Sequence, residues 1–280
     1  MQVIKTAAEL RAWSSQVHSK GKSVGLVPTM GALHEGHLSL VRAAKASCTA
    51  VAASIFVNPT QFGPNEDFAL YPRTFETDCE LLAAEGVEVV FAPAPEEMYR
   101  PGAATFVEVA GLSDRLDGKS RPGHFRGVAT VVAKLLIAAE PDRAFFGQKD
   151  AAQVAVLRRM VADLGLAVEL VVCPIVREQG GLAMSSRNRY LNPAERRQAL
   201  VLSRALAAVE SRVAGGERTS EILIAVAWAT FASEPEVRVD YIAAVDWATL
   251  EPVERAVPGT LFAVAAWVGS TRLLDNFVVG

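Results

Sequence analysis

The sequence predicts an α/β protein in which a doubly wound parallel-sheet domain is followed by a smaller α+β domain. In the first part of the chain, short continuous apolar runs alternate with longer segments whose apolar residues recur at helical spacing, which is typical of a parallel sheet covered by helices. The length of 280 residues also exceeds the usual size of a single hydrophobic core. We therefore expect two domains, residues 1–176 and residues 177–280.

Several apolar runs of the first domain are too short for helices and are rich in β-branched or aromatic residues, as buried strands are. They span residues 24–27, 50–57, 87–92, 144–146 and 168–173. Between them lie helical stripes that would present one face to the sheet, such as Val128, Val131, Leu135 and Leu136. In such a sheet, ligands are expected beyond the carboxyl ends of the strands.

The second domain has a different pattern. Apolar residues spaced three and four apart over 202–213 predict a long helix that ends at Gly215. Alternation over 237–245, then a turn at Pro258 and Gly259 before an apolar run over 261–268, predicts a short antiparallel sheet beside helices.

Composition limits the classes of partner. The formal net charge is -3 and the pI is about 5.9, so no global positive field would attract nucleic acid or an anionic membrane. No stretch approaches a membrane span of ~20 apolar residues, and Met1 to Arg11 lacks the uninterrupted apolar region of a signal peptide. Cys48, Cys79 and Cys173 follow no disulfide or zinc spacing. We expect a cytoplasmic protein with small-molecule partners, no nucleic-acid or membrane partner, and no metal site built from its side chains.

The first informative motif, His34-Glu35-Gly36-His37, follows a predicted strand and opens a predicted helix. Two histidines three residues apart at a helix start point the same way, Gly36 lets a ligand approach the backbone, and the free N–H groups of a first helical turn favour an anion. We interpret the motif as a phosphate-binding element. The alternatives are a pair of surface histidines or half of a metal site.

Polar residues also follow the second predicted strand, in the segment from Asn58 to Asp67. Gln61 in this segment can donate and accept hydrogen bonds without charge, which suits the hydroxyl groups of a polar substrate. An ordinary proline-rich turn is the alternative.

A basic loop of residues 119–127 precedes the helix that begins near Val128. Its start, Gly118-Lys119-Ser120, imitates the end of a P-loop, but Ser113 stands where that motif requires its first glycine. The loop either contacts a substrate or is solvated.

Two further segments carry groups that suit phosphate. Lys149 lies between a strand and a helix, where a point charge would meet an anion, although a solvated Lys149–Asp150 pair is the alternative. Ser185, Ser186 and Arg187 lie at the domain junction, where hydroxyls and a guanidinium can clamp a triphosphate. A hinge for a lid is also expected there.

In combination, these motifs resemble the pantothenate synthetases, members of the HIGH-type nucleotidyltransferase superfamily. The segments that carry the resemblance, in the family's order, are PTMGALHEGH, FVNPTQFGPNED, YPRT, SRPGHFRGVATVVAKL, FFGQKDAAQ and GLAMSSRN. The resemblance is strongest over residues 24–192 and implies a Rossmann-like nucleotidyltransferase domain followed by a closing lid domain. At Gly180 the chain departs from the family, which commonly has an acidic residue there.

The resemblance also implies the binding residues. It assigns ATP to Met30, His34, His37, Gly147, Lys149, Asp150, Val176, Met184, Ser185, Ser186 and Arg187, with Val176 near the adenine. It assigns pantoate to Gln61 and Gln153, β-alanine to Gln61, and the role of general acid to His37. A homodimer, and Mg²⁺ carried on the ATP phosphates, are implied as well.

The implied reaction is the condensation of pantoate with β-alanine through a pantoyl-adenylate, releasing pyrophosphate and AMP. Such a reaction needs alignment and charge stabilisation. The expected catalytic residues are therefore His34, His37, Lys149, Ser186 and Arg187. Two alternatives stay open, a nucleotidyltransferase that makes a dinucleotide or coenzyme product and an ATP-sensing module that forms no AMP. The two glutamines favour a small hydroxy acid over a second nucleotide.

Overall fold

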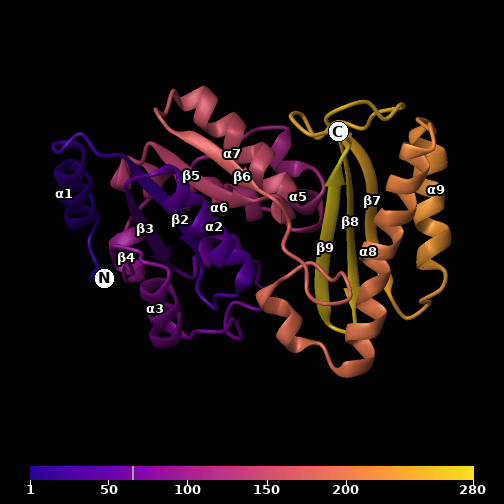
Figure 1. Cartoon of the computed structure of the whole chain (residues 1–280), viewed down its shortest axis with the longest axis horizontal. Coiled ribbons are helices and arrows are strands. Elements are labelled where there is room, and N and C mark those ends of the chain that lie inside the picture. The colour runs from indigo at the N-terminus through magenta and orange to yellow at the C-terminus, as the bar shows by residue number, and fades with distance from the viewer. Residues whose placement is uncertain (65) are drawn as a thin grey trace. The chain divides into compact units, whose positions relative to one another are not determined.

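The computed structural model describes residues 1–64 and 66–280, so Asn65 of the Asn58–Asp67 segment lies outside the described residues. The chain divides into two compact units. The first unit comprises Met1–Gly147 and Val156–Cys173, and the second comprises Gln148–Ala155 and Pro174–Gly280. Figure 1 shows the elements of both units.

The first unit contains a six-stranded sheet in which every paired strand is parallel, in the order β1-β4-β3-β2-β5-β6. The strands are β1 (Gln2–Ile4), β2 (Val24–Thr29), β3 (Ala50–Ile55), β4 (Val89–Phe91), β5 (Arg143–Gly147) and β6 (Glu169–Cys173). Each apolar run that the sequence analysis assigned to the sheet forms one of these strands. The predicted doubly wound parallel-sheet domain is therefore confirmed.

The direction of the strand order reverses at β2. The next strands along the chain, β3 and β4, are added on one side of β2, whereas β5 and β6 are added on the other. Gly25 and Leu26 of β2 pair directly with Arg143 and Ala144 of β5. Ligands of doubly wound sheets bind outside the carboxyl ends of the strands at such a reversal. The chain leaves these two strand ends at Met30 and at Gln148.

Helices cover the sheet of the first unit. They are α1 (Ala7–His18), α2 (Glu35–Ser47), α3 (Phe75–Ala84), α4 (Pro95–Met98), α5 (Asp117–Ser120), α6 (His124–Ala139) and most of α7 (Ala151–Leu164), with the 3-10 turns η1 (Pro59–Gln61) and η2 (Leu112–Asp114). Val41 of α2 and Leu82 of α3 pack with Val27, Val51 and Phe145 of the strands in one buried cluster. Helices α1 and α6 pack against each other and against β2.

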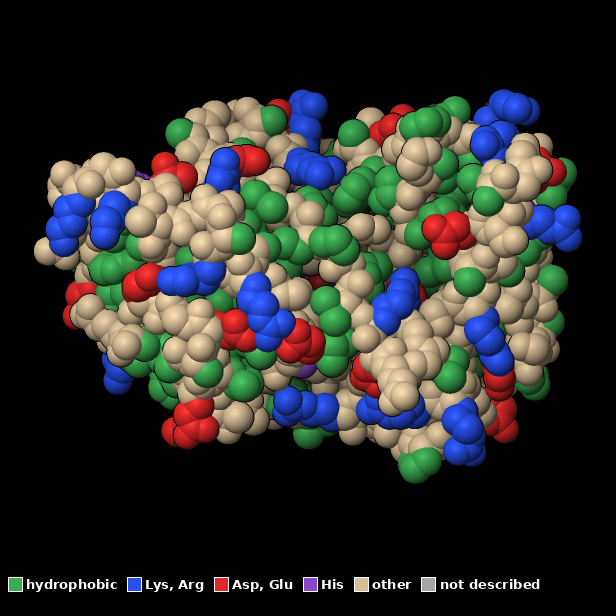
Figure 2. Space-filling view, viewed as in Figure 1, with side chains coloured by type: hydrophobic (Ala, Val, Ile, Leu, Met, Phe, Trp, Pro, Cys, Tyr) green, Lys and Arg blue, Asp and Glu red, His purple; other side chains and the backbone are tan. Residues whose placement is uncertain are grey.

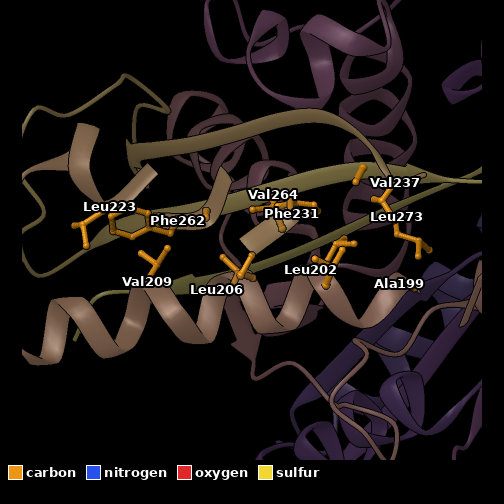
Figure 3. Close-up of a cluster of buried hydrophobic side chains, with 14 of the residues drawn as sticks. Ala199, Leu202, Leu206, Val209, Leu223, Phe231, Val237, Phe262, Val264 and Leu273 are labelled. Atoms are coloured by element: carbon orange, nitrogen blue, oxygen red, sulfur yellow. The ribbon is translucent and has the colours of Figure 1, made fainter. Parts of the chain in front are cut away.

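The second unit contains a three-stranded antiparallel sheet with two helices. The strands β7 (Arg238–Asp246), β8 (Thr260–Val268) and β9 (Thr271–Val278) lie in chain order, and the helices are α8 (Pro193–Ala214) and α9 (Ser220–Phe231). Figure 3 shows Leu202 and Leu206 of α8 directed at strand β8, which carries Phe262 and Val264, in a cluster that also contains Phe231 of α9. This arrangement confirms the predicted α+β domain.

Charges of both signs are mixed on the surface. In Figure 2, lysine and arginine side chains are interspersed with aspartate and glutamate over the face shown, in agreement with the small net charge of -3. Among the helices of the described chain, none has both the length and the hydropathy needed to cross a bilayer.

Candidate functional site

The chain turns sharply between β2 and α2, and Asp78 of α3 holds this turn. The carboxylate of Asp78, which is 1% exposed, accepts hydrogen bonds from the N–H groups of Ala32 (2.9 Å) and Leu33 (2.8 Å). Gly31 has a φ of +81°, and a Cβ atom there would lie 2.9 Å from Oδ2 of Asp78. Position 31 therefore requires glycine, both for its backbone conformation and for space. The turn fixes where α2 begins.

His34 and His37 form the start of α2 together. Nδ1 of His34, the N-cap residue, accepts from the N–H of Gly36 at 3.1 Å, and Nδ1 of His37 accepts from the N–H of His34 at 3.4 Å. The two ring centroids are 4.1 Å apart. Because each Nδ1 accepts, a neutral ring at either position carries its proton on Nε2, and that nitrogen becomes the donor.

One detail of this helix start differs from the expectation. Free backbone N–H groups were expected to favour an anion, but the N–H of Gly36 donates to the His34 ring and that of His37 donates to the His34 carbonyl at 2.8 Å. The reason is that His34 acts as an N-cap, so its side chain and carbonyl satisfy donors that an anion would otherwise meet. The Nε2 atoms of the two imidazoles are further donors of the motif.

Gln61 lies at the end of η1, after β3, with its side-chain amide engaged on both ends. Its Oε1 accepts from Nδ2 of Asn58 at 3.0 Å, and its Nε2 lies 3.1 Å from Sδ of Met30. Asn58 also donates to the carbonyl of Gly127 (3.1 Å) and accepts from the hydroxyl of Tyr99 (2.8 Å). Gln61 is 8% exposed and Asn58 is 1% exposed. Two residues that the resemblance assigns to ATP and to pantoate, Met30 and Gln61, are thus in contact.

The basic segment 119–127, predicted as a loop, is instead formed by the end of α5, a short turn and the first residues of α6, and it contacts the backbone of Gln61. Arg121 forms a two-point ion pair with Glu66, with Nε–Oε1 and Nη2–Oε2 distances of 2.7 and 2.6 Å. Nη1 of Arg121 lies 2.9 Å from Nε2 of His124, and Nδ1 of His124 lies 2.8 Å from the carbonyl oxygen of Gln61. Because a guanidinium only donates and a carbonyl only accepts, the ring of His124 is neutral with its proton on Nδ1.

The electrostatics of this network agree with its geometry. Burial, together with the positive charge of Arg121, lowers the pKa of His124 to about 4. Burial alone would raise the pKa of Glu66, but the hydrogen bonds and charge of Arg121 outweigh it and lower that pKa below its ordinary value. At neutral pH the ring of His124 is therefore neutral and lies between the guanidinium of Arg121 and the carbonyl of Gln61. The carboxylate of Glu66, which pairs with Arg121, is charged.

Another group of candidate residues lies in the second unit, at the start of α7. Lys149 and Asp150 belong to the 3-10 turn η3 (Gln148–Asp150), and Nζ of Lys149 lies 3.3 Å from Oδ1 of Asp150. Gln153 is half-buried in the first turn of α7. Nδ2 of Asn276 in β9 donates to the main-chain carbonyls of Gln148 (3.0 Å) and Lys149 (2.9 Å).

The remaining candidates lie in a hairpin of the same unit. The N–H of Met184 donates to the carbonyl of Val176 at 2.9 Å, so these two residues face each other across the hairpin. Oγ of Ser185 accepts from the N–H of Arg187 at 3.3 Å and thereby caps the 3-10 turn η4 (Ser186–Tyr190). Ser186 is buried, with 8% of its surface exposed.

Within each unit the structure thus gathers the predicted residues into local groups. The first unit holds Met30, His34, His37 and Gln61, with Gly147 at the end of β5, and the second holds Lys149, Asp150, Gln153, Val176, Met184, Ser185, Ser186 and Arg187.

Three residues that were not predicted from the sequence, Asp78, Asn58 and Asn276, support these groups. Each is a buried polar residue that bonds to main-chain or amide groups of a candidate segment. Asp78 lies among other polar residues of α3 and Asn276 lies beside Asp275, so the local sequence carries no signal that singles out either residue.

Comparison with known proteins identifies the family. The chain matches the family model for pantoate-beta-alanine ligase over residues 2–278. It is 62% identical over 291 residues to a pantothenate synthetase from Acidobacterium capsulatum, covering 100% of this chain and 97% of that protein. It is 56% identical over 279 residues to a pantothenate synthetase from Koribacter versatilis, covering 100% of this chain and 96% of that protein.

Solved structures give the same result. A pantothenate synthetase from Thermus thermophilus is 47% identical with a TM-score of 0.94, and the match covers 99% of each chain. A pantoate-beta-alanine ligase from Francisella tularensis, solved in complex with beta-gamma ATP and β-alanine, is 32% identical with a TM-score of 0.81 and covers 100% of this chain and 99% of that one. The resemblance drawn from the motifs is confirmed, and the chain belongs to the pantoate–β-alanine ligase family of enzymes.

Proposed function

We propose that this enzyme condenses pantoate with β-alanine to pantothenate, using ATP and passing through a pantoyl-adenylate. The observation that carries the proposal is the histidine pair at the start of α2, whose Nδ1 atoms both accept hydrogen bonds so that each Nε2 becomes a donor. The pair follows β2, where the strand order reverses and ligands of this fold class bind. The Francisella tularensis relative, solved with an ATP compound and β-alanine, supports the choice of ligands.

In the first step, a carboxylate oxygen of pantoate attacks the α-phosphorus of ATP, and pyrophosphate leaves with the electron pair of the broken P–O bond. Negative charge grows on the phosphate oxygens as this bond breaks. His34, His37, Lys149, Ser186 and Arg187 are the donors that we assign to this charge, with His37 as the general acid. No covalent intermediate with the protein is needed, because the adenylate itself is the activated form of pantoate.

In the second step, the amine of β-alanine attacks the acyl carbon of pantoyl-adenylate and loses a proton as AMP leaves. We assign pantoate to Gln61 and Gln153, and the β-alanine site to the surroundings of Gln61. The fixed position of the Gln61 amide supports this assignment, because Asn58 and Met30 hold its two ends and leave it one orientation.

The remaining ATP contacts that we propose involve Met30, Gly147, Asp150, Val176, Met184 and Ser185, with Val176 beside the adenine. Residues 1–176 would bind most of ATP and pantoate, and residues 177–280 would act as a lid. Closure of such a lid would exclude water from the adenylate. The pairing of Val176 with Met184 supports a common role for the two ends of this hairpin.

Mg²⁺ would reach the site on the phosphates of ATP. Among the described residues, no three His, Cys, Asp or Glu side chains are grouped to hold a metal ion. Mg²⁺ usually keeps several waters and binds through substrate phosphates. The ion would neutralise phosphate charge, while His34, His37 and Lys149 orient the phosphates. We also propose that the enzyme is a cytoplasmic homodimer.

The experiment that tests the proposed function is exchange of labelled pyrophosphate into ATP in the absence of β-alanine. Exchange should require both Mg²⁺ and pantoate, because only formation of the adenylate is reversible under these conditions. Addition of β-alanine should then yield AMP and pantothenate in equal amounts. Formation of ADP and phosphate, or exchange that does not depend on pantoate, would rule out the proposed reaction.

A further inference from the structure

Asn276 of β9 is buried, with 3% of its surface exposed, and its side-chain amide is engaged with the segment that carries Lys149. Nδ2 donates to the carbonyls of Gln148 (3.0 Å) and Lys149 (2.9 Å), and Oδ1 accepts from Nε2 of Gln148 (3.2 Å). Two carbonyl acceptors fix the orientation of the amide, because only its nitrogen donates. Nε1 of Trp247 adds a bond to the carbonyl of Ala151 at 2.9 Å. The C-terminal sheet therefore holds the backbone of residues 148–151.

The neighbouring residue, Asp275, holds the other candidate segment of the same unit. Its carboxylate, 2% exposed, accepts from Nη1 (2.6 Å) and Nη2 (3.0 Å) of Arg177. Nη1 of Arg177 also donates to the carbonyl of Gly181 at 2.9 Å. Gly180 and Gly181 have φ values of +105° and +101°, so the tip of this hairpin has little backbone preference of its own. A two-point ion pair to a buried carboxylate supplies the rigidity that the glycines lack.

Strand geometry explains how the adjacent residues Asp275 and Asn276 contact two different segments. Successive side chains of a strand point to opposite faces of the sheet, so Asp275 and Asn276 point away from each other. Leu273, two residues before Asp275, belongs to the hydrophobic cluster with α8 and α9. Apolar residues would fill these positions without the cost of burying a carboxylate and an amide. Packing of the sheet alone does not account for the pair.

We propose that Asp275 and Asn276 are positioning residues for ATP. Asn276 fixes the main chain at Lys149, and Asp275, acting through Arg177, fixes the hairpin that leads to Arg187. The inference rests on the proposed roles of Lys149 and Arg187 as phosphate contacts. A residue that acts only through Lys149 changes how its ammonium meets the phosphates, so its loss affects ATP and leaves the pantoate contacts in place.

A double-mutant cycle tests the proposed role of Asn276 in positioning Lys149. The full-length wild type, Asn276→Ser, Lys149→Ala and the double variant are compared by pantoate-dependent pyrophosphate exchange and by calorimetric titration with ATP. Asn276→Ser should lower exchange about 10- to 100-fold, as loss of a residue that orients a ligand does. In the Lys149→Ala background the same change should cost less than about twofold, because the group that Asn276 positions is gone. Equal losses in both backgrounds would overturn the inference.

The proposed role of Asp275 in positioning Arg187 is tested in the same way, with Asp275→Asn and Arg187→Ala as the paired changes. If Asp275→Asn lowers exchange as much in the Arg187→Ala background as in the wild type, this role is wrong. The proposed function is tested separately by the single variants Lys149→Ala and Arg187→Ala. If these two keep near wild-type exchange, the phosphate roles are wrong. If they lose exchange but the cycles are additive, only the positioning roles are wrong.

A matched control separates positioning from loss of stability. Asp240 of β7 pairs with Arg272 of β9 at 2.7 and 3.0 Å in the same sheet, and neither residue belongs to the two candidate segments. Asp240→Asn should therefore keep the ATP affinity of the wild type even if its Tm falls. An equal loss of ATP affinity in Asp240→Asn and Asn276→Ser would contradict the inference. If Asn276→Ser fails to fold by circular dichroism, Asn276→Asp replaces it, because a carboxylate has the same shape but cannot donate.

Discussion

Nδ1 of His124 lies 2.8 Å from the main-chain carbonyl of Gln61, and Arg121 on the other side of the ring fixes the imidazole in its neutral form. Arg121 and His124 thus contact the main-chain carbonyl of Gln61, while Asn58 and Met30 hold its side chain. The position of Gln61 therefore depends on Asn58 of its own segment and on contacts from two other segments, those of Met30 and of His124. This arrangement leads to a prediction about stability and one about substrate use.

The stability of the protein should fall on the acid side partly through His124. Its pKa is about 4 in the folded protein and 6.5 in a model compound, so between these values the unfolded chain binds more protons. The contribution of His124 to the free energy of unfolding is complete above about pH 6.5. It is lost as the pH falls toward 4, and the full loss is about 3 kcal/mol. Glu66, whose pKa is lowered by Arg121 against the effect of burial, contributes with the same sign at lower pH.

Urea unfolding at about pH 7 and pH 5 measures this effect. The wild type should lose more unfolding free energy between the two pH values than His124→Asn, whose amide can donate to the same carbonyl but does not titrate. An equal loss in the two proteins would contradict a neutral, buried His124.

Gln61→Ala should damage the use of pantoate more than the binding of ATP. It removes the acceptor of Asn58 and the substrate contact that we propose, and such a loss costs about 10- to 100-fold. Steady-state titration with pantoate and calorimetry with ATP separate the two ligands, and Gln153→Ala should give the same split. The exposed Gln16 of α1 provides a control, Gln16→Ala, that should leave both ligands unaffected. Equal weakening of pantoate and ATP would mean that the glutamines are only structural.

Asp78→Ala should unfold more easily than the wild type, because two buried N–H groups, those of Ala32 and Leu33, lose their acceptor. We expect the free energy of unfolding to fall by about 2–3 kcal/mol. Thermal denaturation gives this value, with Asp163→Ala as a control, since Asp163 forms an exposed pair with Arg159 on α7. Such exposed pairs contribute about 0.5 kcal/mol or less. Similar losses in the two variants would show that Asp78 does not hold the turn.

His37→Ala should fold normally and lose most of its adenylation activity. Removal of one donor from a developing charge costs about 10²–10³ in rate. Pyrophosphate exchange by a variant with a wild-type circular dichroism spectrum measures this loss. His18→Ala is the control, because His18 lies at the end of α1 and pairs with Asp142 at 3.1 Å, outside the proposed site. Near wild-type exchange by His37→Ala would remove it from the mechanism.

Much of the fold could be predicted because the central strands of the parallel sheet, β2, β3 and β4, are buried along most of their length. A run such as Ala50–Ile55 is apolar at almost every position, which is typical of a central parallel strand. Strand β1 was missed because three residues, Gln2–Ile4, are too few to show a pattern. Strand β9 was missed because Asp275 and Asn276 interrupt its apolar alternation. The residues that hid the strand are the ones that contact the candidate site.

The contact between His34 and His37 could be predicted from the local sequence alone. The two histidines of the α2 start lie three residues apart, and their contact follows from helix geometry. Asp78 and Asn276 could not be assigned, because their partners lie 46 and 127 residues away and depend on how the units fold. The use of the Gly36 N–H by His34 was missed because histidine is an uncommon N-cap residue.

Transfer of ¹⁸O from the carboxylate of labelled pantoate is the most direct test of the adenylate. In the proposed route the carboxylate oxygen bonds to the α-phosphorus, and the later attack by β-alanine breaks the bond between that oxygen and the acyl carbon. Mass spectrometry should therefore find one ¹⁸O atom in each AMP, and pantothenate should keep the other. AMP without label, or label in inorganic phosphate, would contradict the account.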